Sequence, residues 1–238
     1  MIDRLYNHVE LEIADRTITY GEVKALLDKA IEMKLRAVCL PPSFVRWAKR
    51  YVGERVKICM YIGAPTGNDT VNAKTVIIRE GLRSGADEFE VCVNLNELKS
   101  GNVEYTLTEL KQLRRACRSK LFKCAIDIGV LAQPELETFC KCAIIAKCDY
   151  ISVGSPFSGV KNDIGGIAKL LCRKIKIKTL SDIPEDGRIQ ALTDGGAERV
   201  GVISLPVAPH SATEDDTNAE KIDFFEKSIK KRFTNSNE

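Results

Sequence analysis

The stretch Phe122–Val153, FKCAIDIGVLAQPELETFCKCAIIAKCDYISV, decides the fold. It opens with a β-rich run, Phe122–Ile128, and closes with a second one, Tyr150–Val153. Between them lies a helical stretch that ends near Lys147 and has Pro134 in its first turn, where proline is tolerated because no helical N–H is needed there. A strand, a helix and another strand in this order predict a βαβ unit with parallel strands.

The same alternation continues on both sides of this unit. One helix start is marked by Thr19 and Glu22, which have the spacing of a capping box. The stretch Asn94–Gly101 is expected to be a loop. The remaining predicted strands are Tyr6–Leu11, Arg36–Leu40, Val56–Ile62, Glu88–Val93, Ile175–Leu180 and Arg199–Ile203.

Eight strands in strict alternation with helices predict an α/β fold with a closed parallel sheet, a TIM (β/α)8 barrel. An open doubly wound sheet is the alternative, but no Gly-x-Gly-x-x-Gly follows the first predicted strand. We expect a single domain over residues 1–238, with the barrel at about 6–232 and a frayed tail at 233–238. The expected final helix covers Ala219–Arg232.

Composition limits the classes of function. The chain has 238 residues, of which 44% are hydrophobic, and its 36 basic and 33 acidic residues give a net charge of +3. This near-balance predicts no nucleic-acid partner. No apolar run reaches the ~18 residues of a membrane span, and the N-terminus lacks the apolar core of a signal peptide. We therefore expect a cytoplasmic protein with no membrane partner.

The nine cysteines form no Cys-x-x-Cys pair. We interpret them as free thiols in a reducing compartment and predict no metal site. Cys39 lies on a strand predicted to face inward, where a core role is favoured over a nucleophilic one.

In a TIM barrel the active site lies at the carboxyl ends of the strands. The polar or small residues expected at those ends are Glu90, Asp127, Ser152, Lys178, Gly201 and Ser204.

Several stretches resemble the deoxyribose-phosphate aldolase family, a class I aldolase family on a TIM barrel. The resemblance extends from about Tyr6 to Ile203 and depends on the order and spacing of its pieces. These pieces are Val38–Val45 (VCLPPSFV), Ile62–Gly67 (IGAPTG), Gly85–Glu90 (GADEFE), Leu98–Gly101 (LKSG), Lys176–Lys178 (KIK) and Arg199–Gly201 (RVG).

The resemblance implies cleavage of 2-deoxy-D-ribose 5-phosphate to glyceraldehyde 3-phosphate and acetaldehyde, without metal or cofactor. A lysine on strand six forms an imine that accepts the electrons of the broken C–C bond. A lysine on strand seven lowers the pKa of that amine, and an aspartate on strand four relays protons. The substrate phosphate binds backbone N–H groups after strands seven and eight. Family members are often dimers, which implies a homodimer.

The chain departs from this pattern at its catalytic positions. Ser152 occupies the place of the imine-forming lysine, and a hydroxyl cannot form an imine. Lys178 occupies the place of the strand-seven lysine. Glu90 occupies the place of the aspartate and is one methylene longer, which displaces the carboxyl group of a proton relay.

The expected substrate-binding positions have changed as well. Ser181 and Asp182 replace the Gly-Gly turn, and the aspartate places negative charge where a phosphate should bind. Asn7 stands where the family has a strand-one aspartate. Gly201 and Ser204 remain as phosphate contacts, and Cys39 completes the expected substrate-binding set.

Two functions follow from these departures. In the favoured hypothesis the chain is an inactive or strongly impaired pseudoenzyme with a scaffold or protein-binding role. In the alternative it is an active aldolase that forms the imine on Lys178, with a phosphorylated sugar or an aldehyde as substrate. Lys161, in the loop after strand six, could also reach the barrel mouth, but a solvated loop lysine is favoured. A metabolite sensor that binds without turnover is a third class. For Lys178 itself, pairing with Glu90 or Asp127 is favoured over imine formation.

Overall fold

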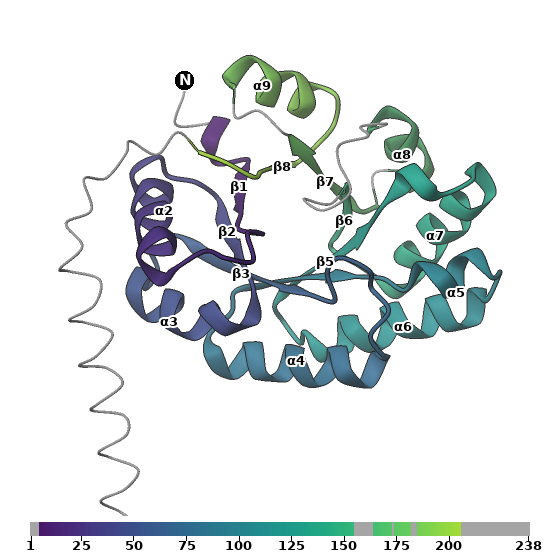
Figure 1. Ribbon diagram of the computed structural model, residues 1–238. Helices are drawn as coiled ribbons and strands as arrows, with labels where there is room; N and C mark the ends of the chain where they lie inside the picture. The colour runs from purple at the N-terminus through teal and green to yellow at the C-terminus, as the bar shows by residue number, and fades with distance from the viewer. Residues whose placement is uncertain (1–4, 155–163, 173, 182–184, 206–238) are drawn as a thin grey trace, which may run out of the picture. The chain divides into compact units, whose positions relative to one another are not determined.

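The barrel is closed and all of its strands are parallel. The computed structural model describes residues 5–154, 164–172, 174–181 and 185–205. Eight strands pair in sequence order, and β8 pairs with β1 to close the ring (Figure 1). This confirms the predicted TIM barrel. The strands are β1 (Val9–Glu12), β2 (Ala37–Leu40), β3 (Lys57–Ile62), β4 (Glu88–Cys92), β5 (Leu121–Ile126), β6 (Tyr150–Val153), β7 (Lys176–Ser181) and β8 (Arg199–Val202).

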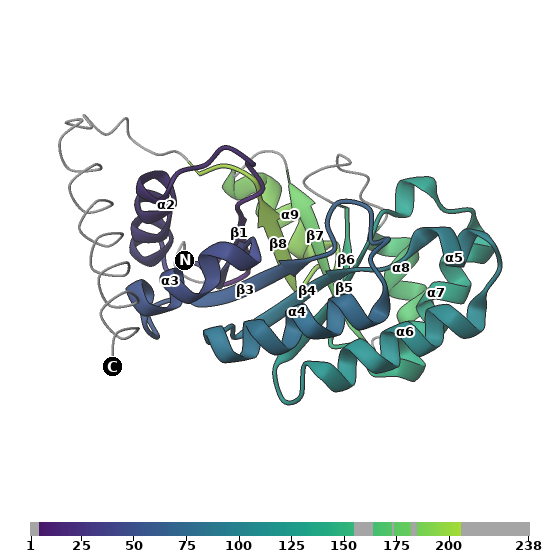
Figure 2. The same ribbon diagram turned by 60° about the horizontal axis from the view of Figure 1, so that its bottom comes forward.

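Helices cover the outside of the barrel, and Figure 2 shows several of them beside the strands. The described helices are α2 (Tyr20–Glu32), α3 (Pro42–Val52), α4 (Val71–Ser84), α5 (Leu95–Lys99), α6 (Val103–Ala116), the 3-10 helix η1 (Ile128–Val130), α7 (Gln133–Ala146), α8 (Ile164–Leu171) and α9 (Asp186–Asp194).

Local sequence accounts for the helix ends. The predicted capping box is present at α2, where the Thr19 side chain accepts from the Glu22 N–H and the Glu22 carboxylate accepts from the Thr19 N–H. Proline lies in the first turn of α7, as predicted. Helix α4 ends at Gly85 with a left-handed φ of 89°, a conformation that glycine adopts without strain.

Several predicted boundaries were wrong. The strand predicted to reach Ile128 ends at Ile126, because Ile128 begins η1. The stretch Asn94–Gly101 contains α5, because the Asn94 side chain accepts from two N–H groups of the helix start. The first strand begins at Val9, three residues later than predicted, since Leu5 and Tyr6 are helical. The weak alternation of polar and apolar residues at the start of the chain therefore reflects only the strand that begins at Val9.

The two faces of the sheet differ in chemistry. Side chains alternate across each strand, so Val9 and Leu11 face the helices while Glu10 and Glu12 face the lumen of the barrel. The helix-facing side chains form one apolar core that continues into the helices. Helix α4 packs closely on the sheet: a Cβ on Gly81 would come 2.6 Å from Phe89 and 2.7 Å from Met60.

One ion pair lies outside the lumen but is fully buried. Lys74 of α4 donates to Glu109 of α6 at 2.7 Å, to the Gly67 carbonyl at 2.5 Å and to the Cys92 carbonyl at 2.8 Å. Glu109 also accepts from the Asn94 N–H at 3.1 Å. The pair thus connects two helices to the loops that follow β3 and β4.

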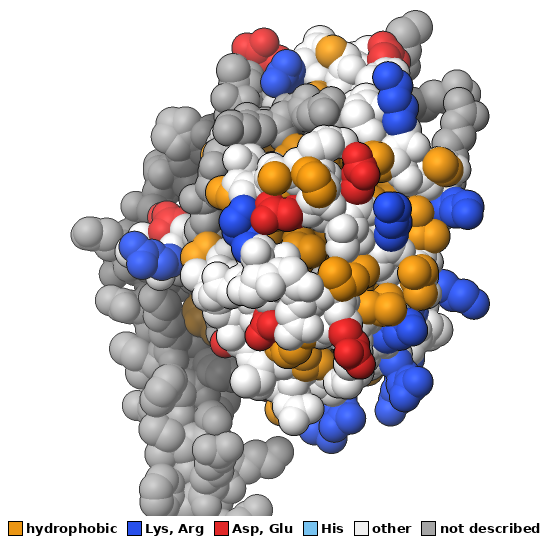
Figure 3. Space-filling view, turned by 90° about the vertical axis from the view of Figure 1, so that its right-hand side faces the viewer, with side chains coloured by type: hydrophobic (Ala, Val, Ile, Leu, Met, Phe, Trp, Pro, Cys, Tyr) orange, Lys and Arg blue, Asp and Glu red, His pale blue; other side chains and the backbone are white. Residues whose placement is uncertain are grey.

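The outer face shown in Figure 3 is mixed in character. Exposed hydrophobic side chains lie among Lys, Arg, Asp and Glu side chains. The exposed large hydrophobic residues of the barrel include Val103, Val130 and Ile145, each on a different element or loop. Single exposed hydrophobic residues are ordinary on soluble surfaces and do not mark a partner site.

All described strands and helices lie within the compact unit Met1–Leu205. The expected final helix at 219–232 and the tail at 233–238 lie outside the described residues, so a single domain over 1–238 stays a prediction. Among the described helices, none is both long and apolar enough to cross a membrane.

The buried pair generates a stability prediction. Replacing Lys74→Met leaves the Glu109 carboxylate buried without its cation, and we expect a loss of about 3–5 kcal/mol in the free energy of unfolding, measured by urea denaturation. The double change Lys74→Met, Glu109→Gln should cost less, because it removes the uncompensated charge and keeps an acceptor for Asn94.

The matched control is the exposed pair of Lys57 and Glu54, whose atoms are 2.9 Å apart. Lys57→Met should cost only about 0–1 kcal/mol. Equal losses for the two lysine variants would contradict the assigned role of Lys74.

Candidate functional site in the barrel lumen

The lumen is lined by polar and charged side chains in place of the branched aliphatic residues that usually fill it. Glu10 and Glu12 come from β1, Glu88 and Glu90 from β4, and all four are buried. The other described polar or titratable residues that face the lumen are Cys39 (β2), Cys59 and Tyr61 (β3), Cys92 (β4), Lys123 (β5), Tyr150 and Ser152 (β6), Lys178 (β7) and Arg199 (β8).

Lys178 is surrounded by three carboxylates. Its Nζ lies 2.9 Å from Glu10 Oε2 and 2.5 Å from Glu12 Oε1, and it also contacts Glu90 Oε2. The Glu12 contact is an ion pair without hydrogen-bond alignment, since neither Glu12 oxygen accepts a hydrogen bond. The lysine side chain is only 1% exposed. This confirms the pairing of Lys178 with Glu90 that the sequence favoured.

Ser152 lies directly beside this lysine. The two residues are register partners on β6 and β7, so their side chains share the lumen face. Ser152 Oγ donates to Glu90 Oε1 at 2.7 Å. Cys39 Sγ approaches the same group from β2, at 3.7 Å from Lys178 Nζ and 3.9 Å from Glu90 Oε2. Lys178, Glu90, Ser152 and Cys39, predicted from separate strands, are therefore brought together.

A second layer of ion pairs lies nearer the amino-terminal ends of the strands. Lys123 contacts Glu10 and lies 3.1 Å from Glu88 Oε2 and 3.5 Å from Glu90 Oε2. Arg199 contacts Glu10 and lies 2.5 Å from Glu88 Oε2. Glu10 therefore bridges both layers, since it meets three cations.

Burial and charge move the carboxyl groups in opposite directions. Burial raises the pKa of the Glu12 carboxyl to about 7; Lys178 opposes this, while the neighbouring Glu90 and Glu10 add to it. Burial also acts to raise the pKa of Glu90, but Lys178 and Lys123 outweigh it and hold that pKa below its ordinary value. Glu12 is thus the carboxyl group of the lumen that binds a proton near neutral pH.

The same contacts keep Lys178 charged. Burial acts to lower the pKa of its amine, but Cys39 and the carboxylates of Glu10, Glu12 and Glu90 raise it well above the ordinary lysine value. An imine-forming amine must lose its proton before it attacks a carbonyl carbon. The geometry therefore favours an ammonium that organises carboxylates over a nucleophile.

Four donor groups could in principle hold a cation. The ligand atoms of Glu10, Glu12, Cys39 and Glu90 lie within 4.8 Å of one another. The Lys178 ammonium, however, is in contact with each of these carboxylates and already supplies the positive charge. A divalent cation would have to displace it, so the donor set does not fit a resident metal.

The structure places the expected substrate-binding residues in different environments. Ser181 ends β7 and is fully buried, whereas Ser204 follows β8 and is exposed. Gly201 faces the lumen, where a Cβ would come 2.9 Å from Glu12 Oε1. Asp182 lies outside the described residues, as does Lys161. Asp127 follows β5 and accepts from the Gly129 N–H at 2.9 Å, so it does not pair with Lys178.

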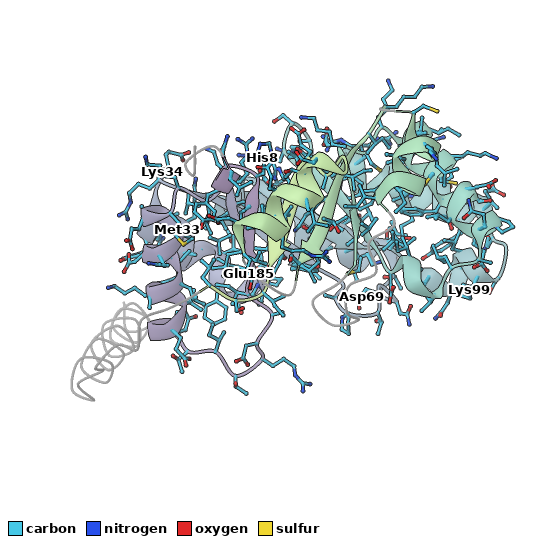
Figure 4. The ribbon with its side chains drawn as sticks, turned by 90° about the horizontal axis from the view of Figure 1, so that it is seen from above. His8, Met33, Lys34, Asp69, Lys99 and Glu185 are labelled. Atoms are coloured by element: carbon cyan, nitrogen blue, oxygen red, sulfur yellow. The ribbon has the colours of Figure 1, made fainter. Side chains whose placement is uncertain are left out.

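Asn7 lies at the amino-terminal end of the barrel. It precedes β1 and lines a pocket with His8, Arg36, Lys176 and Glu198, and with Tyr150 and Arg199 at that end of the lumen. Figure 4 shows the two ends of the barrel apart, with His8 and Lys34 at one end and Asp69, Lys99 and Glu185 at the other. Asn7 therefore lies away from the carboxyl end of the strands, where TIM barrels have their active sites, and its contact with substrate stays a prediction.

Five charged residues of the lumen were not predicted as part of the site: Glu10, Glu12, Glu88, Lys123 and Arg199. Their signal was in the sequence. Each alternates with apolar residues in a strand whose other face packs on helices, as in VELE of β1 and EFEVC of β4. In a closed barrel such alternating charges point inward.

Glu12 gives the stability of the protein a pH dependence. Its pKa is about 7 in the folded state and about 4.5 ordinarily, so the folded state binds more protons between these values. The free energy of unfolding should therefore fall as pH rises from about 4.5 to 7, by on the order of 3 kcal/mol. We expect Glu12→Gln to flatten this slope in urea denaturation at a series of pH values.

The matched control is Glu32→Gln, which changes an exposed carboxylate of α2. This variant should keep the slope of the native protein. A native-like slope in Glu12→Gln would show that another group binds the proton.

The comparisons with known proteins agree with the fold and show the family. A model of the DeoC/LacD family aldolases matches residues 5–153. The chain is 33% identical over 187 residues to the deoxyribose-phosphate aldolase of Ureaplasma urealyticum serovar 10, covering 77% of this chain and 87% of the relative. It is 29% identical over 200 residues to that of Clostridioides difficile strain 630, covering 83% and 91%.

Solved structures give the same result. QR15, an aldolase, superposes with a TM-score of 0.80 at 25% identity, covering 85% of this chain and 92% of that one. The tetrameric deoxyribose phosphate aldolase of Aeropyrum pernix superposes with a TM-score of 0.78 at 18% identity, covering 84% and 87%, which shows the fold alone. With a parallel barrel and a lysine-containing lumen already established, the family match shows that this chain belongs to the DeoC/LacD family of aldolases and is deoxyribose-phosphate aldolase-like.

Proposed function

We propose that this chain is a member of the aldolase family that no longer forms an imine, and that its barrel is retained as a scaffold for binding a protein or a small molecule. One observation carries the proposal. Lys178 is the lysine at the centre of the expected site, and its ammonium is in contact with carboxylates of Glu10, Glu12 and Glu90.

The physical reason is the protonation state. Imine formation needs the lone pair of a neutral amine, and class I aldolases obtain it by placing a cation or an apolar wall beside the lysine. Three carboxylates around Lys178 do the opposite. The neighbouring position on β6 offers the Ser152 hydroxyl, whose hydrogen bond to Glu90 holds it as a donor. Neither group supplies the required nucleophile.

The alternative, an active aldolase that uses Lys178, is weaker on the same grounds. It would require the buried ammonium to release its proton while three carboxylates remain at contact distance. Burial favours that release, but the three carboxylate contacts oppose it and outweigh it.

The remaining parts of the proposal concern partners and location. A homo-oligomer is supported by the tetrameric Aeropyrum pernix relative, and a cytoplasmic location by the free cysteines of the described residues. A protein partner follows from the scaffold role. If the barrel binds a small molecule, the candidates are a phosphorylated sugar or an aldehyde, the compounds of the reaction that the family resemblance implies.

The proposal predicts no imine and no turnover. Cleavage of 2-deoxy-D-ribose 5-phosphate, measured by coupling to glyceraldehyde 3-phosphate oxidation, should be at least ~10³-fold slower than for the Clostridioides difficile relative, because the nucleophile is missing. Incubation with acetaldehyde and sodium borohydride should leave no adduct on Lys178 by peptide mass mapping.

Lys178→Met is the control for both measurements, and it should match the native protein. Turnover at the rate of the relative, or an adduct on Lys178 that is lost in this variant, would establish the alternative. Saturable binding of the sugar phosphate without turnover would instead identify a sensor.

A further inference from the structure

We propose that, in a chain that forms no imine as argued above, Glu12 is the residue that keeps amines in the lumen charged, so that restoring the lysine at position 152 is not sufficient to restore imine chemistry. Glu12 acts through the charge balance of the lumen. It is a charge-controlling residue and has no role as a nucleophile or a proton donor to substrate.

The described lumen contains one carboxylate more than it has cations. Four carboxylates, Glu10, Glu12, Glu88 and Glu90, face the three cations Lys123, Lys178 and Arg199. If all were ionised, the group would carry a formal charge of −1. Because these side chains are nearly fully buried, water does not compensate for the excess, and the balance decides which groups hold protons.

Glu12 is the surplus acid by its contacts. Glu10 meets three cations, Glu88 meets Lys123 and Arg199, and Glu90 meets two lysines and the Ser152 hydroxyl. Among the described residues, Glu12 has a single ion-pair contact, Lys178, and neither of its oxygens accepts a hydrogen bond.

The side chain of Glu12 fits its place in the lumen, but the contacts between strands depend on it less than on the other carboxylates. Its carboxylate occupies space next to Gly201, where any Cβ would come within 2.9 Å of Oε1. Glu12 forms an ion pair with one other strand, whereas the other three carboxylates each form ion pairs with cations on at least two other strands. Removal of Glu12 therefore changes the charge of the lumen with the least loss of the contacts that hold the strands together.

The consequence for an introduced amine follows from counting charges. Ser152→Lys raises the number of cations to four, which equals the number of carboxylates, so each amine has a counter-ion and stays protonated. Adding Glu12→Gln leaves three carboxylates for four cations. One buried amine then lacks a counter-ion and lies beside the positive Lys178, which favours its neutral form.

The groups that face this amine come from every strand of the barrel. Those that can carry charge or titrate are Glu10 and Glu12 on β1, Cys39 on β2, Cys59 and Tyr61 on β3, Glu88, Glu90 and Cys92 on β4, Lys123 on β5, Tyr150 on β6, Lys178 on β7 and Arg199 on β8. Only Glu12 combines a carboxyl group with a single described ion-pair contact, so its charge is the one that responds most directly to an added amine.

The experiment compares aldehyde trapping in Ser152→Lys with trapping in Ser152→Lys, Glu12→Gln. Acetaldehyde and sodium cyanoborohydride are the probes: the amine nitrogen bonds to the carbonyl carbon, the oxygen leaves as water, and a hydride reduces the C=N bond to a stable amine. At pH 7 we expect the double variant to form the adduct at position 152 about 100-fold faster, as a shift of two pKa units implies.

Ser152→Lys, Glu12→Asp is the matched control, because it keeps the charge and changes the shape. It should trap aldehyde as slowly as Ser152→Lys alone. The single variant should approach the rate of the double variant only at alkaline pH, where its amine loses the proton. Circular dichroism and thermal melting confirm that each variant is folded.

Two outcomes would overturn the inference: rapid trapping at pH 7 in Ser152→Lys alone, or slow trapping at pH 7 in a folded double variant. The single variant alone decides the first, even if the double variant does not fold. Failure of the proposed function gives a different result, because native protein would then trap aldehyde at Lys178 and not at position 152.

Discussion

The contact between the Lys178 ammonium and the carboxylates of β1 and β4 governs the chemistry of this molecule. Charges that are removed from water must be paired, and pairing them in a narrow lumen fixes both their positions and their protonation. Strands on opposite sides of the ring are thereby connected through their side chains. The same pairing that fills the lumen withdraws Lys178 from nucleophilic chemistry.

The sequence predicted the fold well because the fold depends on a repeated and redundant signal. Each strand is a short apolar run, each helix has its own start and stop residues, and an error at one boundary leaves the count unchanged. The late start of β1 and the missed helix α5 show this. In both places short-range capping or turn contacts decided the local structure, and the barrel was still correct.

The site was predicted only in part. Lys178, Glu90, Ser152 and Cys39 were found because family motifs mark them, and the structure brings them together. Glu10, Glu12, Glu88, Lys123 and Arg199 were not, because their importance depends on which partner lies across the lumen. That partner is set by strand register and tilt, which the sequence of one strand does not contain. Asn7 lies at the other end of the barrel from these residues, because a motif gives the order of residues but not the end of the barrel to which they belong.

The buried pair of Lys74 and Glu109 has a consequence for how such a protein can change over time. It secures the helices and loops from outside the sheet, while the lumen charges lie on the other side of the same strands. Substitutions in the lumen therefore leave this outer support in place. In a barrel built in this way the outer layer and the lumen can evolve separately. The outer layer keeps the chain folded, while the lumen can change from one activity to another or lose activity.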